Sequence, residues 1–169
     1  TPHYPLHETD YFENLLFGEK PSVQDYYNEV SYGKFKFIKA GILGWYKSSY
    51  KYDEKGPKDS LVRDAFKKAA NDKSFNFKSY DINDDRILTS DELDIVVCSS
   101  GYSEYEPFGA YHNWGLKGGL IRTWDGMILD GDHSAVQEWQ NWMVWAHELG
   151  HSLMLPDLYD YKKTSQGIG

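Results

Sequence analysis

Two histidines and a glutamate at helical spacing form the most specific chemical pattern in the sequence, His147-Glu148-Leu149-Gly150-His151. Residues four positions apart lie on one face of a helix, so both imidazoles can reach one zinc ion. Glu148 can reach a water on that metal without being a ligand itself. Such short matches also occur by chance in unrelated helices. Here, however, the motif falls in the most apolar stretch expected to be helical, where these groups would be costly to bury without a partner such as zinc.

A zinc hydrolase needs a third protein ligand and one open coordination position. Downstream of His151 the sequence holds no further His, Glu or Cys, and its only acidic residues are Asp157 and Asp160. Pro156 should end or bend the helix, which would let the chain turn back beneath the metal. We therefore expect Asp157 to be the third ligand. The alternatives are Asp160, a tyrosine oxygen, His112 and His133.

A second pattern, rich in oxygen side chains, spans Asp81–Glu92. It places oxygen donors at positions 1, 3, 5, 9 and 12 of a twelve-residue calcium loop, with an apolar residue at position 8. Position 6, glycine in such loops, is Arg86, which must supply a sharp turn at some conformational cost. The alternative is a solvated turn rich in Asp and Asn. The expected calcium ligands are side chains of Asp81, Asn83, Asp85 and Glu92, the carbonyl of Ile87 and, through water, Thr89.

The elements that must position these groups indicate an α+β fold. Two helices are expected where a capping residue precedes apolar residues at helical spacing, over residues 22–32 and 59–70. Strands are expected from β-branched or alternating residues at 34–39, 42–46 and 93–98. Asp125-Gly126 is a hairpin signal between residues 120–124 and 127–129. Residues 99–119 lack a clear period and are expected to form a long surface loop.

The helix that carries the two histidines is expected to begin at Ser134 and to continue through Leu153. Its apolar positions cover most of the helical circumference, so it should be central and buried. The expected architecture is a mixed twisted sheet with a buried active-site helix carrying HExxH.

Length, charge and cysteine content limit the classes of protein to which this chain can belong. A length of 169 residues suffices for one domain with a sizeable core. The formal net charge of -8 lacks the basic footprint of a nucleic-acid binder. No apolar stretch reaches the roughly 18 residues of a membrane span. Cys98 is the single cysteine, so it cannot form an intrachain disulfide; we expect a buried small side chain rather than a reactive or metal-bound thiol.

The stretch from His147 to Asp160 resembles the active-site signature of the immune inhibitor A family of secreted zinc metallopeptidases, a metzincin-like group. The segments Gln24–Tyr27 and Ser31–Phe35 resemble the early part of that catalytic domain, and the acidic loop is similar too. The resemblance implies a single metallopeptidase catalytic domain over residues 1–169. It also implies zinc ligands at His147, His151 and Asp157, with Glu148 as general base.

The sequence departs from this family in two places. The family usually has glycine at the turn between the second and third ligands, where this chain has Met154; a positive φ there would strain methionine. The family's methionine-containing turn under the zinc should follow Gly169. We therefore expect residues 1–169 to be the larger, N-terminal part of a catalytic domain that a downstream segment or a second chain completes. The alternative is a divergent protein that dispenses with the rest of the domain.

Two functions from different classes follow. The first is a secreted zinc endopeptidase that hydrolyses protein or peptide substrates, with the calcium loop as a structural staple suited to an extracellular setting. The second is a non-catalytic extracellular module in which the metals only hold the fold. Its interaction surface would be the aromatic loop from Tyr102 to Trp114.

Overall fold

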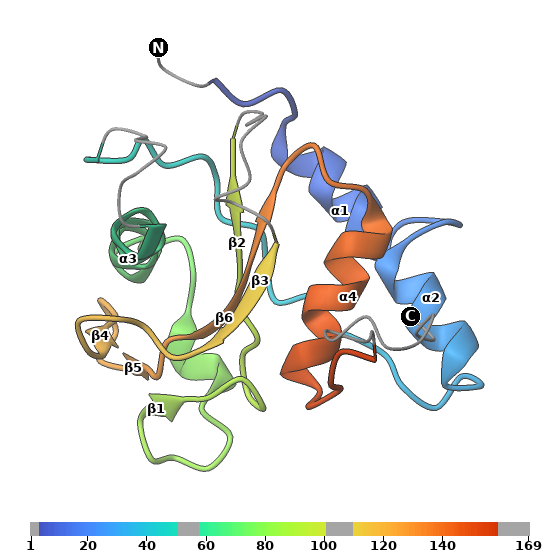
Figure 1. Cartoon of the computed structure of the whole chain (residues 1–169). Coiled ribbons are helices and arrows are strands. Elements are labelled where there is room, and N and C mark those ends of the chain that lie inside the picture. Colours follow the sequence, from blue (N-terminus) through green and yellow to red (C-terminus); the bar gives the residue numbers. More distant parts are fainter. Residues whose placement is uncertain (1–3, 51–57, 101–109, 159–169) are drawn as a thin grey trace.

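A computed structural model describes residues 4–50, 58–100 and 110–158 of the chain (Figure 1). Within these ranges the fold is α+β, as the sequence predicts, with four α-helices and two small mixed sheets. The helices are α1 (Thr9–Phe17), α2 (Val23–Val30), α3 (Lys58–Ala70) and α4 (Trp142–Ser152), with a 3-10 turn at Phe77–Tyr80. No helix in the described part of the chain is long and apolar enough to cross a membrane.

The strands form two separate three-stranded sheets, and the expectation of one mixed sheet was wrong. The six strands are β1 (Ile87–Leu88), β2 (Val96–Ser99), β3 (Tyr111–Trp114), β4 (Ile121–Arg122), β5 (Ile128–Leu129) and β6 (Asp132–Gln137). One sheet has the order β1-β5-β4 and the other β2-β6-β3. In the larger sheet β6 pairs parallel with β2 and antiparallel with β3. The short strands of the smaller sheet pair only with one another, around the predicted hairpin, whose Gly126 has a φ of +94°.

Strand β6 stands where the sequence predicted the first turns of the histidine-bearing helix. All of its residues are buried, because neighbouring strands flank it and the fold covers both of its faces. A strand buried on both faces need not alternate between apolar and polar residues. Residues 134–137 therefore carry no strand pattern, and the sequence assigns them to the helix that follows them. The helix α4 begins only at Trp142. Its N-cap is Asn141, whose Oδ1 accepts hydrogen bonds from the N–H groups of Met143 and Val144 at 3.0 and 3.4 Å.

Two further expectations about strands and loops were wrong. Residues 34–39 and 42–46 form no strand. The rings of Phe35 and Phe37 pack against Tyr27 with centroids 5.8 and 5.1 Å away, so packing on α2 explains the alternation of apolar residues. The expected long loop over residues 99–119 contains β3, whose Tyr111 pairs with Ala135 of β6. The predicted N-cap Ser22 is confirmed, since its Oγ accepts from the Asp25 N–H at 3.1 Å.

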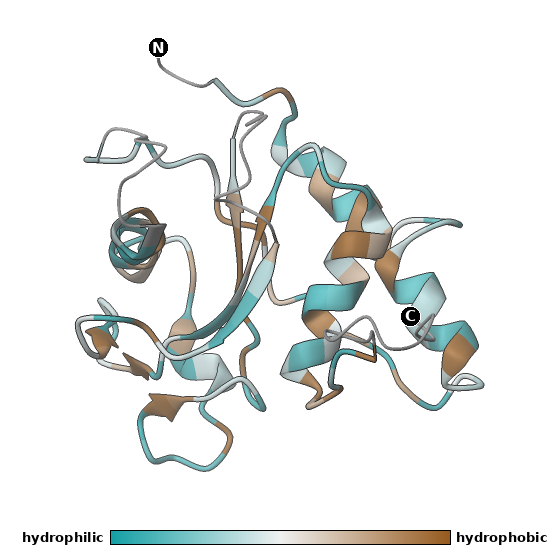
Figure 2. Cartoon of the chain, in the orientation of Figure 1, coloured by the Kyte–Doolittle hydropathy of each residue, from teal (hydrophilic) through white to brown (hydrophobic). Residues whose placement is uncertain are grey.

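Helix α4 lies between the larger sheet and the pair α1 and α2 (Figure 1). One apolar cluster joins α4 to α1 and α2 through Phe12, Val23 and Trp145, and a second lies among α3 and the strands. Figure 2 shows hydrophobic segments on α4 and on the helices beside it. Cys98 packs against the first cluster, and burial raises the pKa of its thiol, as expected for an unreactive side chain. The sheet and two helices thus hold α4 on opposite sides.

Candidate metal centre

Helix α4 ends in a tight turn that reverses the chain toward its own last residues. The Leu155 N–H donates to the Gly150 carbonyl at 3.1 Å and the Met154 N–H to the His151 carbonyl at 2.9 Å. This is the Schellman pattern, which places one residue in the left-handed region. That residue is Met154, with a φ of +63°, so the positive φ considered for this position is present. The helix ends before Pro156 is reached, and the reversal begins at Met154.

The reversal brings Asp157 to the two histidines of α4. Asp157 Oδ1 lies 3.0 Å from His147 Nε2 and 3.4 Å from His151 Nε2. One ligand atom from each of the three residues lies within 4.8 Å of the others. The imidazole rings of His147 and His151 have centroids 4.8 Å apart and are nearly perpendicular. The structure therefore assembles the three side chains that the sequence singles out.

The orientation of His151 is fixed by a backbone carbonyl. Its Nδ1 lies 2.8 Å from the oxygen of Leu155. Because a carbonyl can only accept, Nδ1 carries the hydrogen of this bond and Nε2 is the nitrogen that faces the cluster. Histidines that bind metals are commonly held in this way by their second nitrogen. Nothing in the local sequence identified Leu155 as this partner, because the contact depends on the left-handed turn at Met154.

The donor set fits a zinc ion. Two imidazole nitrogens and one carboxylate oxygen are ligands that zinc accepts at about 2.0–2.2 Å, so two ligands of a tetrahedral ion lie about 3.3 Å apart. The distances of 3.0 and 3.4 Å from the Asp157 oxygen to the two imidazole nitrogens agree with that spacing. His147 is exposed, which leaves access to the cluster from solvent.

Glu148 lies between the two histidines in sequence and is buried, with 5% of its surface exposed. Desolvation raises the pKa of its carboxyl to about 7, with an opposing effect from His151 and a further increase from Asp157. A carboxyl with a pKa near neutrality can both accept and release a proton at physiological pH. The acid–base role expected of Glu148 from the sequence stays a prediction.

The two upstream histidines that were alternative ligands lie in other contacts. His112 Nε2 lies 2.9 Å from Asp132 Oδ1. His133 is buried, and its Nδ1 lies 2.8 Å from the carbonyl oxygen of Gly131. Neither belongs to the cluster formed by the helix and its turn. Asp160 and the tyrosines that follow Leu158 lie outside the described residues.

The acidic loop over residues 81–92 is closed by its last carboxylate. Glu92 Oε1 accepts from the N–H groups of Ile82 at 2.9 Å and Asn83 at 3.4 Å. Arg86 has a φ of +66°, so the sharp turn expected at the sixth position is present. The Arg86 N–H donates to Asp81 Oδ2 at 3.1 Å. In the described chain these carboxylates do not form a group of three ligand atoms within 4.8 Å of one another.

The aromatic loop predicted as an interaction surface is described only in part. Residues 102–109 of it lie outside the described ranges. Its end, Tyr111–Trp114, is strand β3 at the edge of the larger sheet. Trp114 on this strand is 62% exposed.

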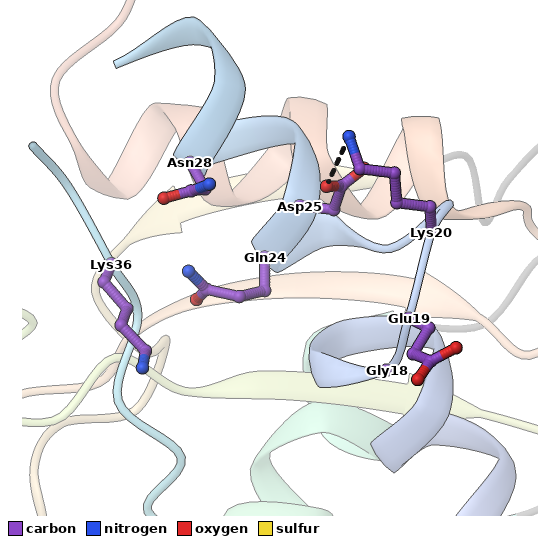
Figure 3. A pocket seen from close by; sticks show the side chains of 7 residues that line it. All are labelled: Gly18, Glu19, Lys20, Gln24, Asp25, Asn28 and Lys36. Carbon is purple, nitrogen blue, oxygen red and sulfur yellow. Dashed lines mark ion pairs between the residues drawn. The ribbon is translucent and has the colours of Figure 1, made fainter. Parts of the chain in front are cut away.

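A polar pocket of about 550 Å³ lies away from the histidine cluster, between α2 and the chain on either side of it (Figure 3). It is lined by residues 18–20 and by Gln24, Asp25, Asn28 and Lys36. Figure 3 shows the ion pair between Lys20 and Asp25, whose charged atoms are 3.2 Å apart. None of the residues predicted to bind metal lines this pocket, so it takes no part in the candidate site.

No family model matches the sequence. Proteins of two strains of Vibrio cholerae serotype O1, each named pre-pro-metalloprotease PrtV, are similar to it. Each is 26% identical over an alignment of 211 residues that covers 97% of this chain and 23% of the Vibrio protein. The chain thus spans about a quarter of the length of these relatives. The similarity indicates a distant relation to a metalloprotease across almost the whole chain.

Proposed function

We propose that this chain is the zinc-binding part of an endopeptidase, with His147, His151 and Asp157 as the metal ligands. The observation that carries the proposal is the convergence of these three side chains, together with the commitment of His151 Nδ1 to the Leu155 carbonyl. A structural role for two histidines would not require both Nε2 atoms to face one carboxylate oxygen. The distant similarity to a metalloprotease supports the same reading.

The proposed chemistry is hydrolysis of a peptide bond. A zinc ion held by the three ligands would polarise the substrate carbonyl and lower the pKa of water to about 7. Glu148 takes a proton from the attacking water onto its carboxylate and passes it to the leaving amine. Burial of this carboxyl, which raises its pKa to about 7, suits both halves of that transfer.

The acidic loop is proposed as a calcium site that stabilises the fold. The positive φ of Arg86 supplies the turn that glycine supplies in such loops. Asp81 Oδ1 is buried and has no hydrogen-bond partner among the described residues, which a cation would provide. The ligands would be Asp81, Asn83, Asp85, the Ile87 carbonyl and Glu92. A calcium ion here would tie the 3-10 turn at Phe77–Tyr80 to the chain that leads into β2.

Residues 1–169 are proposed to form one catalytic domain of the immune inhibitor A type, with a metzincin-like fold. The similarity to the Vibrio cholerae protein covers 97% of this chain and 23% of that protein. The pre-pro form in the name of that protein supports an extracellular setting, and a protein or peptide is the proposed substrate.

Zinc content and peptide cleavage test the proposal together. After dialysis against metal-free buffer, atomic spectroscopy should find about one zinc per chain, as expected for a site with three protein ligands. Removal of zinc by 1,10-phenanthroline should abolish cleavage of an unstructured peptide, and added zinc should restore it. Failure of the wild type to bind zinc more tightly than His151→Ala would overturn the proposal.

The second candidate is a metal-stabilised module without catalysis. Exposed Trp114 favours it, because it lies on a strand that pairs on one side only among the described residues, and such an edge suits a bound protein segment. This function predicts zinc binding with no cleavage of any peptide. The cleavage assay above therefore separates the two candidates.

A further inference from the structure

Two buried hydroxyl groups donate hydrogen bonds to the backbone of α4, one on each side of His147 in sequence. Tyr27 Oη donates to the carbonyl oxygen of Ala146 at 2.7 Å. Ser134 Oγ donates to the carbonyl oxygen of Glu148 at 3.0 Å. The two acceptors are thus the carbonyl groups of the residues immediately before and after the first histidine of the motif.

Tyr27 reaches α4 from helix α2. It is 5% exposed, and the rings of Phe35 and Phe37 meet it edge to face. Burial raises the pKa of its phenol, so the hydroxyl keeps its hydrogen as a donor at every physiological pH. Among the described residues, the acceptor of the Tyr27 hydroxyl is the Ala146 carbonyl oxygen.

Ser134 reaches α4 from the opposite side, from the central strand β6, and has no exposed surface. His112 Nδ1 lies 3.1 Å from its Oγ, and His112 Nε2 lies 2.9 Å from Asp132 Oδ1. The order Asp, His, Ser is that of a nucleophilic triad. A nucleophile must meet substrate, however, and this hydroxyl is fully buried with its hydrogen directed to a peptide carbonyl.

The contacts from Asp132 through His112 to Ser134 instead suit a role in orienting the Ser134 hydroxyl. A hydroxyl has one hydrogen, and that of Ser134 goes to the Glu148 carbonyl. His112 Nδ1 lies 3.1 Å from the Oγ of Ser134 and so contacts this hydroxyl from β3. This chain of contacts fixes the Ser134 hydroxyl from β3 and β6, the two strands that lie against α4.

A helix held only by apolar packing can shift or rotate slightly between its neighbours, whereas hydrogen bonds to its carbonyls are directional. Figure 1 shows α4 between α2 and the larger sheet, so the two bonds act from opposite sides. Metal and catalytic groups need placement to within about 0.5 Å. We propose that Tyr27 and Ser134 are positioning residues that fix α4 so that His147 and Glu148 face the metal. This inference rests on the proposed zinc site.

The test compares Tyr27→Phe and Ser134→Ala, each of which removes one hydroxyl, with two matched controls. Tyr80→Phe removes a phenol that donates to the Ala40 carbonyl at 3.2 Å, and Ser99→Ala a hydroxyl that donates to the Val136 carbonyl at 3.4 Å. Neither control bond involves α4. The measurements are zinc Kd by competition with a chromophoric chelator, hydrogen exchange of the α4 amides, and kcat and KM for a peptide.

We expect the zinc Kd of both variants to rise about tenfold, as for loss of an outer-shell partner. The α4 amides should exchange faster, and kcat should fall with KM unchanged, because substrate contacts are not touched. Both controls should match the wild type in zinc Kd. Zinc Kd and α4 exchange equal to those of the controls would overturn the inference. If the wild type itself binds no zinc, the proposed function fails; the positioning of α4 is then judged by exchange alone, measured in the same four variants.

Discussion

Gly150 leaves the space that the Tyr27 hydroxyl occupies, because a Cβ atom on Gly150 would lie 3.0 Å from that oxygen. Glycine within a helix costs about 0.5–1 kcal/mol relative to alanine, so its presence in the last turn of α4 needs a reason. The close approach of a buried phenol supplies one. The two residues are therefore coupled across the interface between α2 and α4.

Gly150→Ala should lower the free energy of unfolding by about 1 kcal/mol, since overpacking against Tyr27 outweighs the gain in helix propensity. The same substitution in a Tyr27→Phe background should be neutral or stabilising. Urea unfolding of the wild type, both single variants and the double variant measures this coupling. Equal effects of Gly150→Ala in the two backgrounds would show that the contact carries no strain.

Glu148→Gln should keep zinc bound and lose activity. The amide preserves the size of the side chain but cannot accept the proton of water, so kcat should fall at least about 100-fold. Zinc content and cleavage rate are measured on the same preparation. Glu29→Gln, on the exposed face of α2, is the control and should match the wild type. A Glu148→Gln protein that cleaves peptides at the wild-type rate would refute the general-base role.

Asp157→Ala should weaken zinc binding by more than 100-fold, a larger effect than the roughly 10–100-fold loss seen for outer-shell partners. The reason is that it removes the oxygen that meets both histidine Nε2 atoms. Competition with a chelator of known affinity measures the change. Asp91→Ala, in the exposed end of the acidic loop, tests for a nonspecific effect of charge on zinc affinity. Unaltered zinc affinity in Asp157→Ala would require another third ligand.

Calcium should raise the melting temperature of the zinc-loaded protein. A ligand at 100 times its Kd stabilises the folded state by about 2.7 kcal/mol. Differential scanning calorimetry with calcium, and then with excess EGTA and zinc restored, measures the shift. Glu92→Gln weakens the carboxylate that closes the loop and should lose most of this response. A wild-type melt that is the same in calcium and in EGTA would leave the loop as a solvated turn.

Met154→Gly should stabilise the chain, in contrast to most glycine substitutions. The left-handed region costs a residue with a side chain about 1–2 kcal/mol, which exceeds the entropic cost of glycine. Met154 is 75% exposed, so little packing is lost. We expect a net gain of about 0.5–1 kcal/mol, measured by urea unfolding in EDTA. Leu155→Gly, one residue later and outside the positive-φ region, should destabilise; stabilisation by both variants would point to another cause.

The features that the sequence predicted well are those set by neighbouring residues. Ser22 caps α2 through the N–H three residues on, and Gly126 turns the hairpin through its own φ. The spacing of the two histidines is likewise a property of a single helix. The positive φ at Met154 was anticipated only through the family resemblance, because the family usually has glycine at this turn. The roles of the metal ligands and of the calcium loop stay predictions until zinc and calcium are measured.

The features that the sequence did not predict depend on distant partners. β6 is a strand because β2 and β3 pair with it on both sides. The residues of β6 alone do not indicate this pairing. Residues 34–39 form no strand, because no described strand pairs with them and their aromatic rings pack on Tyr27 instead. Tyr27 and Ser134 each make one decisive hydrogen bond, and a single bond leaves no period in the sequence.

The bond from Tyr27 to Ala146 joins residues 119 positions apart. All three proposed zinc ligands, by contrast, lie between residues 147 and 157. Closing so long a loop costs chain entropy, so this contact forms late in refolding unless the intervening chain has already folded. On the ribosome the order of synthesis favours the second route, because the segments that form α2 and β6 emerge before the histidines do. The metal-binding segment would then fold against α2 and the larger sheet after these have formed.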